Sequence, residues 1–497
     1  MAALALAAAG VWGERAPAQT VAPPPVLSFA TSGDAGFDAW RADFAARAIA
    51  QGRNPDVVRR LLDGLRPDPQ IIQQDQNQAE FVRPPWEYVN GAVSPARVQA
   101  GLTKRAENAI LFGQIQERFG VDADIVAGIW GVETNFGAVV LKYDAADALA
   151  TLAYDQRRRG RFEGFLLSLM EMVERGYAGP SELKSSWAGA MGQPQFMPDM
   201  YLSTAIDWDG DGRRDIWSNT GDVLASIANY LAKHGWKRAE PVFEEVRLPG
   251  NFDYALADNT PRPVSEWQGR GVTPIGGTAW SAEEGQQSAQ LYLPAGWQGP
   301  ALLLFDNFQV IKTYNNSDRY ALAVALLARA FKGQSGLVRP WPTQLGAMRR
   351  EDILALQQSL TRTGYDAGAV DGMFGAATRR AVRAFQQANA MPADGYPTDA
   401  LLEIVRARDP QASAMPKPTA QALLLVDQAD GRPLSKAQIK QLQRNLNALG
   451  YRLGAPNGIA GAKTRAAIAA EERKLGLPPT GRATSFILAQ TRKRLGR

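Results

Sequence analysis

The sequence predicts a mainly helical α+β protein, in which a helical body carries a small inserted β-region and is followed by two small three-helix domains. Three observations predict this class. Between Phe37 and about Lys332, apolar residues recur mostly at the three- and four-residue spacings of amphipathic helices. Short β-rich pieces interrupt that pattern between about residues 241 and 310. Beyond residue 340 the chain repeats itself at an offset of 86 residues.

The helical body follows a linker-like stretch that contains Pro and Ser. The segments with clear helical spacing are 37–51, 55–65, 94–119 and 221–233. The β-rich pieces, which Gly and Pro separate, are 242–248, 290–293 and 301–305. We therefore expect a small sheet set into a helical body.

The internal repeat consists of positions that match at the fixed offset. These are Leu356–Leu360 with Leu442–Leu446, Gly364-Tyr365 with Gly450-Tyr451, and Gly372, Gly375 and Thr378-Arg379 with Gly458, Gly461 and Thr464-Arg465. Each copy has about 60 residues, which suits a small three-helix domain and is too short for a solenoid unit. We expect these domains at 345–406 and 433–494, with a Pro- and Ala-containing linker at 407–432.

The composition restricts the available chemistry. At 497 residues the chain exceeds what one core normally supports, and its formal charge of +5 is too small to indicate nucleic-acid binding. It has no cysteine and a single histidine, His234, which excludes Cys-His nucleophiles and typical zinc hydrolases. A Ser-His-Asp triad would have to use His234, which we interpret as a capping or surface residue in the last helical turn before Gly235. Acid–base chemistry then depends on carboxylates.

The N-terminus carries a short apolar run, 1–11, followed by Ala16-Pro17-Ala18, a small-residue pattern like a signal-peptidase site. The run is too short to span a membrane. No Lys or Arg precedes it, so a disordered Ala-rich tail is the alternative. We expect residues 1–35 to be a signal-peptide remnant and linker of an exported, soluble protein. Without cysteine, a bacterial lipid attachment site is not expected.

One carboxylate, Glu133, lies near the end of the otherwise uncharged run 125–137. A carboxyl group against apolar surface is costly to ionise, so its pKa rises and it can hold a proton to donate. Ile129, Trp130 and Phe136 supply such a surface in this run. Glu133 is therefore the candidate catalytic acid, and the alternative is a carboxylate at the exposed end of a buried helix.

The uncharged loop 185–198 holds two Gly and two Pro residues, which indicates a tight backbone. Ser186, Gln193 and Gln195 offer neutral hydrogen bonds there, which suit sugar hydroxyl and acetamido groups. A buried structural loop would have a similar composition.

The first repeat resembles the small peptidoglycan-binding domain attached to many cell-wall enzymes. The resemblance rests on Gly364-Tyr365, Val370–Gly375, Thr378, Ala381-Val382 and Phe385-Gln386. The second copy has Asn457 for Asp371, Ile459-Ala460 for Met373-Phe374, and Glu471 for Phe385. We expect it to keep the fold with weakened or altered binding.

Five motifs in order resemble the lytic murein transglycosylase B family over roughly residues 37–332. They are Gly131–Gly137, Ala188–Pro198, Asp207–Trp217, Ile227–Leu231 and Tyr314–Ser317. The resemblance implies a lysozyme-like fold at 36–334 with Glu133 as catalytic acid. It also implies glycan contacts from Arg157, Arg158, Ser186, Gln195, Tyr314 and Asn315. For Arg157 and Arg158 the alternative is a solvated basic face.

Residues 207–215 place acids at positions 1, 3, 5 and 9 and Gly212 at position 6 of a calcium loop. Position 12 is Ser218, where a Glu is expected. The resemblance to the family implies that Asp222 closes the site after a longer loop. The predicted ligands of a structural calcium ion are Asp207, Asp209, Asp211, Arg213 and Asp222. The alternative is an Asp-rich turn that caps helices.

The resemblance implies cleavage of the β-1,4 bond between N-acetylmuramic acid and N-acetylglucosamine in periplasmic peptidoglycan. Glu133 would act as acid and then as base toward the muramyl C6 hydroxyl, which forms a 1,6-anhydro ring without a cofactor. Ordinary glycosidases use two carboxylates, and no second acid lies beside Glu133 in its motif. The alternatives are a hydrolytic muramidase and a non-catalytic wall-binding scaffold.

Overall fold

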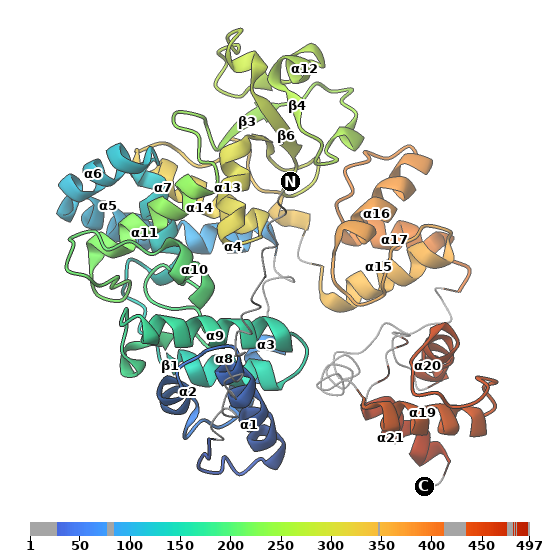
Figure 1. The fold of residues 1–497 in the computed structure, drawn as a ribbon. Coiled ribbons are helices and arrows are strands. Elements are labelled where there is room, and N and C mark those ends of the chain that lie inside the picture. The colour runs from blue at the N-terminus through green and yellow to red at the C-terminus, as the bar shows by residue number, and fades with distance from the viewer. Residues whose placement is uncertain are drawn as a thin grey trace, which may run out of the picture.

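The computed structural model describes residues 27–76, 84–345, 348–411, 434–474, 481, 483 and 485–495. These residues form a helical body with a small sheet at one end and two three-helix units, as the sequence predicts (Figure 1). The expected N-terminal signal remnant lies mostly outside the described residues. Within them, no helix combines the length and the apolar character needed to cross a bilayer.

Most helices of the body begin at residues that suit a helix N-terminus. Side chains of Asp34, Asn54, Ser94 and Asp122 accept hydrogen bonds from the first backbone N–H groups of α1, α2, α5 and α7. In chain order the helices are α1 Ala35–Ala50, α2 Pro55–Leu62, α3 Pro69–Gln76, α4 Pro85–Ala92, α5 Pro95–Glu107, α6 Ala109–Phe119, α7 Ala123–Thr134, α8 Ala145–Tyr154, α9 Arg159–Glu174, α10 Pro198–Thr204, α11 Thr220–Lys233, α13 Asp306–Tyr314 and α14 Asp318–Phe331.

The predicted helical segment 94–119 is divided into α5 and α6 at Asn108. Asn108 has φ −118° and ψ 26°, and its side-chain Nδ2 donates to the carbonyl of Lys104 over 2.9 Å. Asn side chains compete in this way with backbone hydrogen bonds, which explains why apolar spacing alone did not reveal the break.

The inserted β-region forms a five-stranded sheet in the order β4-β6-β7-β3-β5, and every pairing is antiparallel. The strands are β3 Phe243–Arg247, β4 Arg262–Pro263, β5 Thr273–Pro274, β6 Ser288–Tyr292 and β7 Ala301–Leu304, and the short α12 Val264–Gly269 packs on the sheet. Alternate residues of β7 point to opposite faces: Leu303 enters the sheet's own core with Trp267, and Leu302 enters the main core. The sheet is thus fastened to the helical body through a shared strand.

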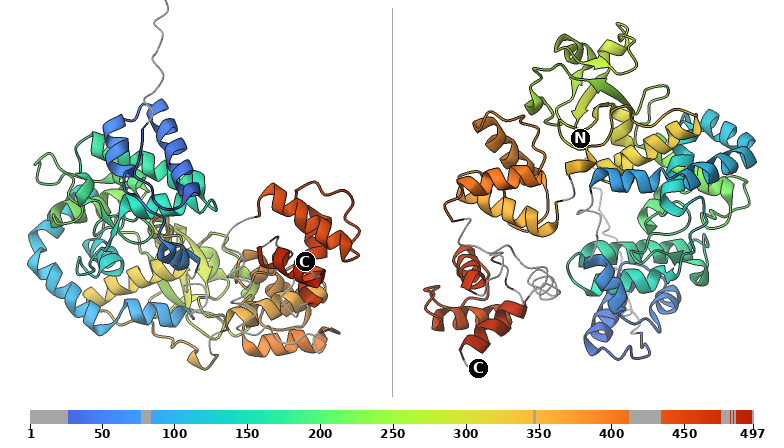
Figure 2. Two further views of the ribbon diagram at one scale, coloured as in Figure 1. Left: turned by 90° about the horizontal axis from the view of Figure 1, so that it is seen from below. Right: turned by 180° about the vertical axis from the view of Figure 1, so that it is seen from behind.

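Each C-terminal repeat is a unit of three helices, which confirms that expectation (Figure 2). The first has α15 Arg350–Arg362, α16 Ala376–Ala388 and α17 Asp399–Arg408; the second has α19 Lys436–Ala448, α20 Ala462–Lys474 and α21 Ser485–Arg494. The matching residues hold the same turn in both copies. Gln357 donates to Thr378 Oγ1 over 3.0 Å and accepts from the Gly372 N–H over 2.9 Å.

In the second repeat Gln443 makes the same two bonds, to Thr464 Oγ1 over 3.1 Å and from the Gly458 N–H over 2.9 Å. Both glycines have positive φ, 74° at Gly372 and 77° at Gly458, which a side chain would strain. The conserved spacing of the two copies therefore maintains the scaffold and carries no information about ligands.

Two hydrogen bonds join the first repeat to the β-region. Asp394 Oδ2 accepts from the Trp297 N–H over 2.9 Å, and the Arg383 guanidinium donates to the Ala257 carbonyl over 2.6 Å. The first repeat is therefore in direct contact with the body.

A buried carboxylate joins the first helix of the body to α9. Glu163 accepts hydrogen bonds from Trp40 Nε1, Arg47 and Arg159, each over 2.9 Å. Burial acts to raise the pKa of Glu163, but the hydrogen bonds from Arg47, Arg159 and Trp40 outweigh it and lower the pKa to about 2.

Because this folded-state pKa is depressed, the stabilisation is present above about pH 4.5 and is lost as the pH falls toward 2. E163Q is expected to lower the free energy of unfolding at pH 7 by about 2 kcal/mol and by much less at pH 2. Urea unfolding at both pH values measures the difference. The control is D43N, which alters an exposed partner of Arg47 and should change stability by less than about 0.5 kcal/mol. An E163Q effect of equal size at both pH values would contradict this account.

Candidate functional site

Glu133 lies in the last turn of α7 and is partly exposed, whereas most of this helix is buried. Ile129 and Trp130, which precede it by four and three residues, share its side of the helix and are 0% and 2% exposed. The structure thus places the carboxyl group at the boundary between an apolar wall and solvent. This is the setting that the sequence predicts for a proton donor.

A second side chain, Tyr320 of α14, contacts this carboxyl group. The Tyr320 hydroxyl donates to Glu133 Oε1 over 2.6 Å. Burial, with the charge of Glu133 adding to it, raises the pKa of Tyr320 well above its usual value, so the hydroxyl keeps its proton. Tyr320 could not be identified from the sequence, because 187 residues separate the two partners. The only local signal is that Tyr320 closely follows the motif Tyr314–Ser317.

The chain turns sharply after α7 at two non-glycine residues with positive φ, Asn135 (49°) and Phe136 (60°). Asn commonly ends helices in this conformation, but a bulky aromatic residue rarely adopts it. The turn directs the Phe136 ring against Trp130 at 5.5 Å in an edge-to-face arrangement. The strained turn therefore places the aromatic ring next to the apolar residues at the end of the helix.

The Gln193 amide connects the uncharged loop to α7. Its Oε1 accepts from Trp130 Nε1 over 2.7 Å, and its Nε2 donates to the Trp217 carbonyl over 2.8 Å. Its backbone carbonyl accepts from Thr134 Oγ1 over 2.9 Å. The predicted role of Gln193 in sugar binding stays a prediction, and these contacts show that it positions the end of α7.

Gln195 and Ser186 bond within the loop itself. Gln195, at φ 57°, donates from Nε2 to the Gly192 carbonyl over 2.8 Å, and Ser186 Oγ accepts from the Ala190 N–H over 3.3 Å. Tyr314, whose ring is stacked 6.4 Å from that of Tyr320, donates to the Pro194 carbonyl over 2.6 Å. Tyr314 thus joins the loop to the carboxylate's partner.

Tyr314 also interacts electrostatically with Glu133. Burial and the charge of Glu133 raise the pKa of Tyr314 well above its usual value. Asn315, the last of the predicted glycan residues, is exposed at the end of α13. Glu133, the loop and the end of α13 therefore form one site.

Arg157 and Arg158 do not form a free basic face. Both pair with Asp75 of α3, Arg157 over 2.5 Å, and the Asp75 side chain is only 3% exposed. Arg157 also pairs with Asp155 over 2.6 Å. These ion pairs fix both guanidinium groups, while their side chains stay 33% and 43% exposed. No motif in the sequence indicates Asp75 as their partner.

The Asp-rich loop gathers Asp207, Asp209 and Asp211, whose carboxylate oxygens lie within 4.8 Å of one another. Asp207 accepts from the Gly210 and Gly212 N–H groups over 2.7 and 2.9 Å, and Gly212 makes the turn at φ 88°. Three oxygen donors that converge on one point suit a hard cation such as calcium.

Two predicted metal ligands have other contacts in this structure. Asp222 is fully buried and accepts from the Trp208 N–H over 2.8 Å and the Asp215 N–H over 2.6 Å, so it closes the loop by hydrogen bonds. Burial, with Asp209 and Asp207 adding their charge, raises the pKa of Asp222 to about 6. The Arg213 side chain pairs with Glu182 over 3.1 Å.

His234 lies where the sequence predicts. It ends α11, and its ring stacks on Tyr230 at 4.0 Å. His234 thus has the capping place that the sequence predicts, and carboxylates remain the candidates for acid–base chemistry.

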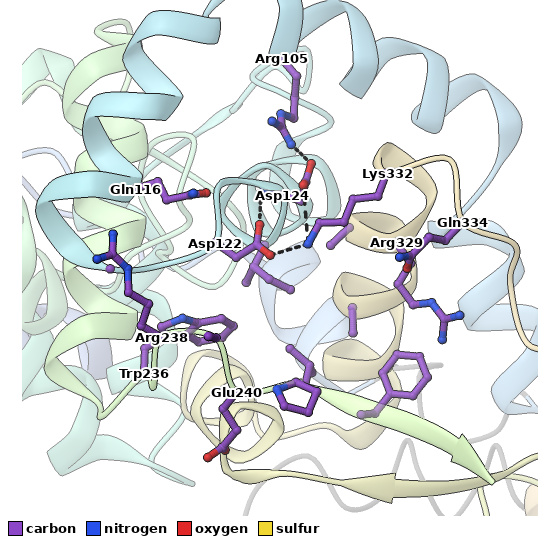
Figure 3. A pocket seen from close by; sticks show the side chains of 18 residues that line it. Arg105, Gln116, Asp122, Asp124, Trp236, Arg238, Glu240, Arg329, Lys332 and Gln334 are labelled. Atoms are coloured by element: carbon purple, nitrogen blue, oxygen red, sulfur yellow. Dashed lines mark hydrogen bonds and ion pairs between the residues drawn. The ribbon is translucent and has the colours of Figure 1, made fainter. Parts of the chain in front are cut away.

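The opposite end of α7 faces a separate hollow of about 790 Å³ (Figure 3). Lys332 pairs there with Asp122 over 2.5 Å, and Arg105 pairs with Asp124 (Figure 3). The Lys332 pair holds the N-terminal end of α7 to the end of α14, and the Arg105 pair holds it to α5, both at the far end of α7 from Glu133. None of the predicted site residues lines this hollow.

Comparison with known families matches residues 36–329 to the transglycosylase SLT domain. The chain belongs to this family. Two further stretches, 349–405 and 435–490, match a family of peptidoglycan binding domains. The chain is 32% identical over 293 residues to the membrane-bound lytic murein transglycosylase B of Escherichia coli K12, covering 57% of this chain and 76% of that protein.

Solved structures of the transglycosylase family agree. The chain is similar to SltB3 of Pseudomonas aeruginosa in complex with NAG-NAM-pentapeptide, at 44% identity and a TM-score of 0.72, covering 75% of this chain and 100% of that one. It is also similar to the Escherichia coli lytic transglycosylase Slt35 in complex with calcium, at 30% identity and a TM-score of 0.52, covering 59% and 92%.

Removing the Tyr320 hydroxyl tests its role at the site. Y320F is expected to lower kcat/KM about ten- to hundredfold, because hydrogen bonds to charged groups are among the strong ones. Its pH–rate profile should extend to higher pH, because a carboxylate that loses a donor to its charged form keeps its proton longer. Turbidity loss of purified sacculi across a pH series measures both. Y154F, which removes a hydroxyl bonded to Asp34, is the control. A uniform loss without a pH shift would reduce Tyr320 to a packing role.

Proposed function

We propose that this transglycosylase cleaves the β-1,4 bond between N-acetylmuramic acid and N-acetylglucosamine without water and leaves 1,6-anhydromuramic acid ends. The observation that carries the proposal is the partly exposed carboxyl group of Glu133, at an apolar wall and bonded to Tyr320. The relatives support the substrate, since one is a lytic murein transglycosylase and another binds a NAG-NAM-pentapeptide.

In the first step Glu133 donates its proton to the glycosidic oxygen as the bond to the muramyl C1 breaks. The carboxylate that forms is stabilised by the Tyr320 hydroxyl, whose raised pKa keeps it a donor. This hydrogen bond is stronger once the carboxylate is charged, so it favours proton transfer.

In the second step the same carboxylate takes the proton of the muramyl C6 hydroxyl, and this oxygen bonds to C1. An alcohol on the sugar itself replaces the water that a second carboxylate would activate, so one acid serves both steps. Arg157, Arg158, Ser186, Gln195, Tyr314 and Asn315 are the residues we propose to line the glycan.

The products decide between this reaction and its alternatives. The parent chain is expected to release muropeptides that end in anhydromuramic acid, lighter by one water than reducing ends, in mass spectra of digested sacculi. E133Q should lower the rate by at least about 10² because the acid and base are lost, while the protein still binds sacculi. Reducing ends would show a hydrolytic muramidase, and unchanged activity of E133Q would place catalysis elsewhere.

The cellular location follows from the proposed substrate. We propose that the chain acts in the periplasm, where peptidoglycan lies, with residues 345–406 and 433–494 as wall-binding domains joined by 407–432. Their binding would keep the catalytic domain at 36–334 close to an insoluble polymer and raise its effective concentration there.

We further propose that the Asp-rich loop holds a structural calcium ion. The support is the convergence of Asp207, Asp209 and Asp211, together with the calcium complex of Slt35. Loop residues Ile216 and Trp217 bond to Gln193, which bonds to α7, so the ion would stiffen the support of Glu133.

Calcium is expected to stabilise the fold by about 2.7 kcal/mol at a free concentration 100-fold above its Kd, and therefore to raise the Tm. Thermal unfolding with calcium and with a chelator measures this rise. D209N should abolish it, whereas D56N, at a side chain 79% exposed and outside the loop, should not. An equal rise in all three proteins would exclude the loop as the site.

A further inference from the structure

The two C-terminal repeats share a scaffold but differ at one surface. In the first repeat a hollow of about 480 Å³ opens where α15 and α17 end beside α16. Its lining residues are Arg362, Thr363, Gly364, Tyr365, Phe385, Asn389, Arg408 and Pro410. Tyr365 and the buried Phe385 form its aromatic floor, with ring centroids 5.4 Å apart in an edge-to-face arrangement.

The two arginines that line this hollow have different partners. Arg362 donates over 2.8 Å to the fully buried carboxylate of Asp409, so its charge is balanced within the repeat. Arg408 is exposed, and its guanidinium lies 5.4 Å from the centre of the Phe385 ring. Across the part of the chain that the structure describes, no carboxylate pairs with Arg408.

The second repeat satisfies the equivalent arginine internally. At the offset of 86 residues, Arg494 replaces Arg408 and Glu471 replaces Phe385. Glu471 is fully buried, pairs with Arg494 and accepts from the Tyr451 hydroxyl over 2.8 Å. A carboxylate of the chain thus occupies, in the second repeat, the place between the arginine and the tyrosine.

We propose that the hollow of the first repeat binds a carboxylate of the peptidoglycan stem peptide through Arg408, and that the second repeat lacks this site because Glu471 takes the ligand's place. A guanidinium group recognises a carboxylate through paired hydrogen bonds. The N-acetylated sugars of the glycan are neutral, whereas the stem peptides carry free carboxylates, so the charge selects the peptide. The proposal rests on the proposed function for its substrate class.

Binding of full-length E133Q, which is not expected to turn over its substrate, tests the proposal. The probes are intact sacculi and sacculi whose free carboxylates have been converted to neutral amides with a carbodiimide and ammonia, each in a sedimentation series that yields an apparent Kd. Adding R408Q is expected to weaken binding to intact sacculi about tenfold and to leave binding to the amidated sacculi unchanged. The matched control is R380Q, which removes the same charge from an exposed position of α16 outside the hollow.

Two results would overturn the proposal. Equal binding of the R408Q and R380Q proteins to intact sacculi would show that Arg408 contacts no ligand. An equal loss on intact and amidated sacculi would assign Arg408 to the sugar chain or another neutral group of the wall. Because Arg408 is exposed, R408Q should keep the parent Tm, which thermal unfolding checks. These readouts do not depend on turnover, so an absence of anhydro products in the parent chain would contradict the proposed function alone.

Discussion

The close approach of α7 and α14 is the constraint on which the site depends. A side chain on Gly128 would lie 2.9 Å from the Val324 carbonyl, and one on Gly131 would lie 2.6 Å from the Phe136 ring. Gly128 therefore has to lack a Cβ for the two helices to pack at this distance, whereas Gly131 leaves room for the Phe136 ring that follows α7. The contact at one end is the bond from Tyr320 to Glu133, so the carboxyl group that we propose as the catalytic acid is held by the core of the body.

The uncharged loop that contains Gln193 also supports the end of α7. Gln193 accepts from Trp130 and donates to Trp217, and the backbone of Gln193 bonds to both Thr134 and Ile216. One amide thus connects the helix that carries the acid to the Asp-rich loop. A partly buried amide with all these partners tolerates few alternatives, since each lost bond leaves a polar group unsatisfied. The positive φ of Phe136 persists in this setting because the surrounding packing determines it.

The repeats show how a duplicated scaffold acquires two different surfaces. Gln357 and Gln443 hold equivalent turns by equivalent bonds, so the fold survives a change at the neighbouring surface. The change from Phe385 to Glu471 converts an aromatic floor into an internal ion pair with Arg494. The expectation of altered binding in the second copy thus has a physical basis in one substitution, and its test is a binding measurement.

The sequence by itself determined the helical class, the inserted sheet, the two three-helix repeats and the family, because these depend on local periodicity and on motifs of contiguous residues. It also singled out Glu133, since an isolated carboxylate in an apolar run is visible without a structure. Only the tertiary structure decided the partners: Tyr320 for Glu133, Asp75 for Arg157, and Trp130 for Gln193. Side chains that are 63 to 187 residues apart meet through the packing of helices. Such contacts leave no periodic signal in one sequence, because each depends on how whole elements are placed in space.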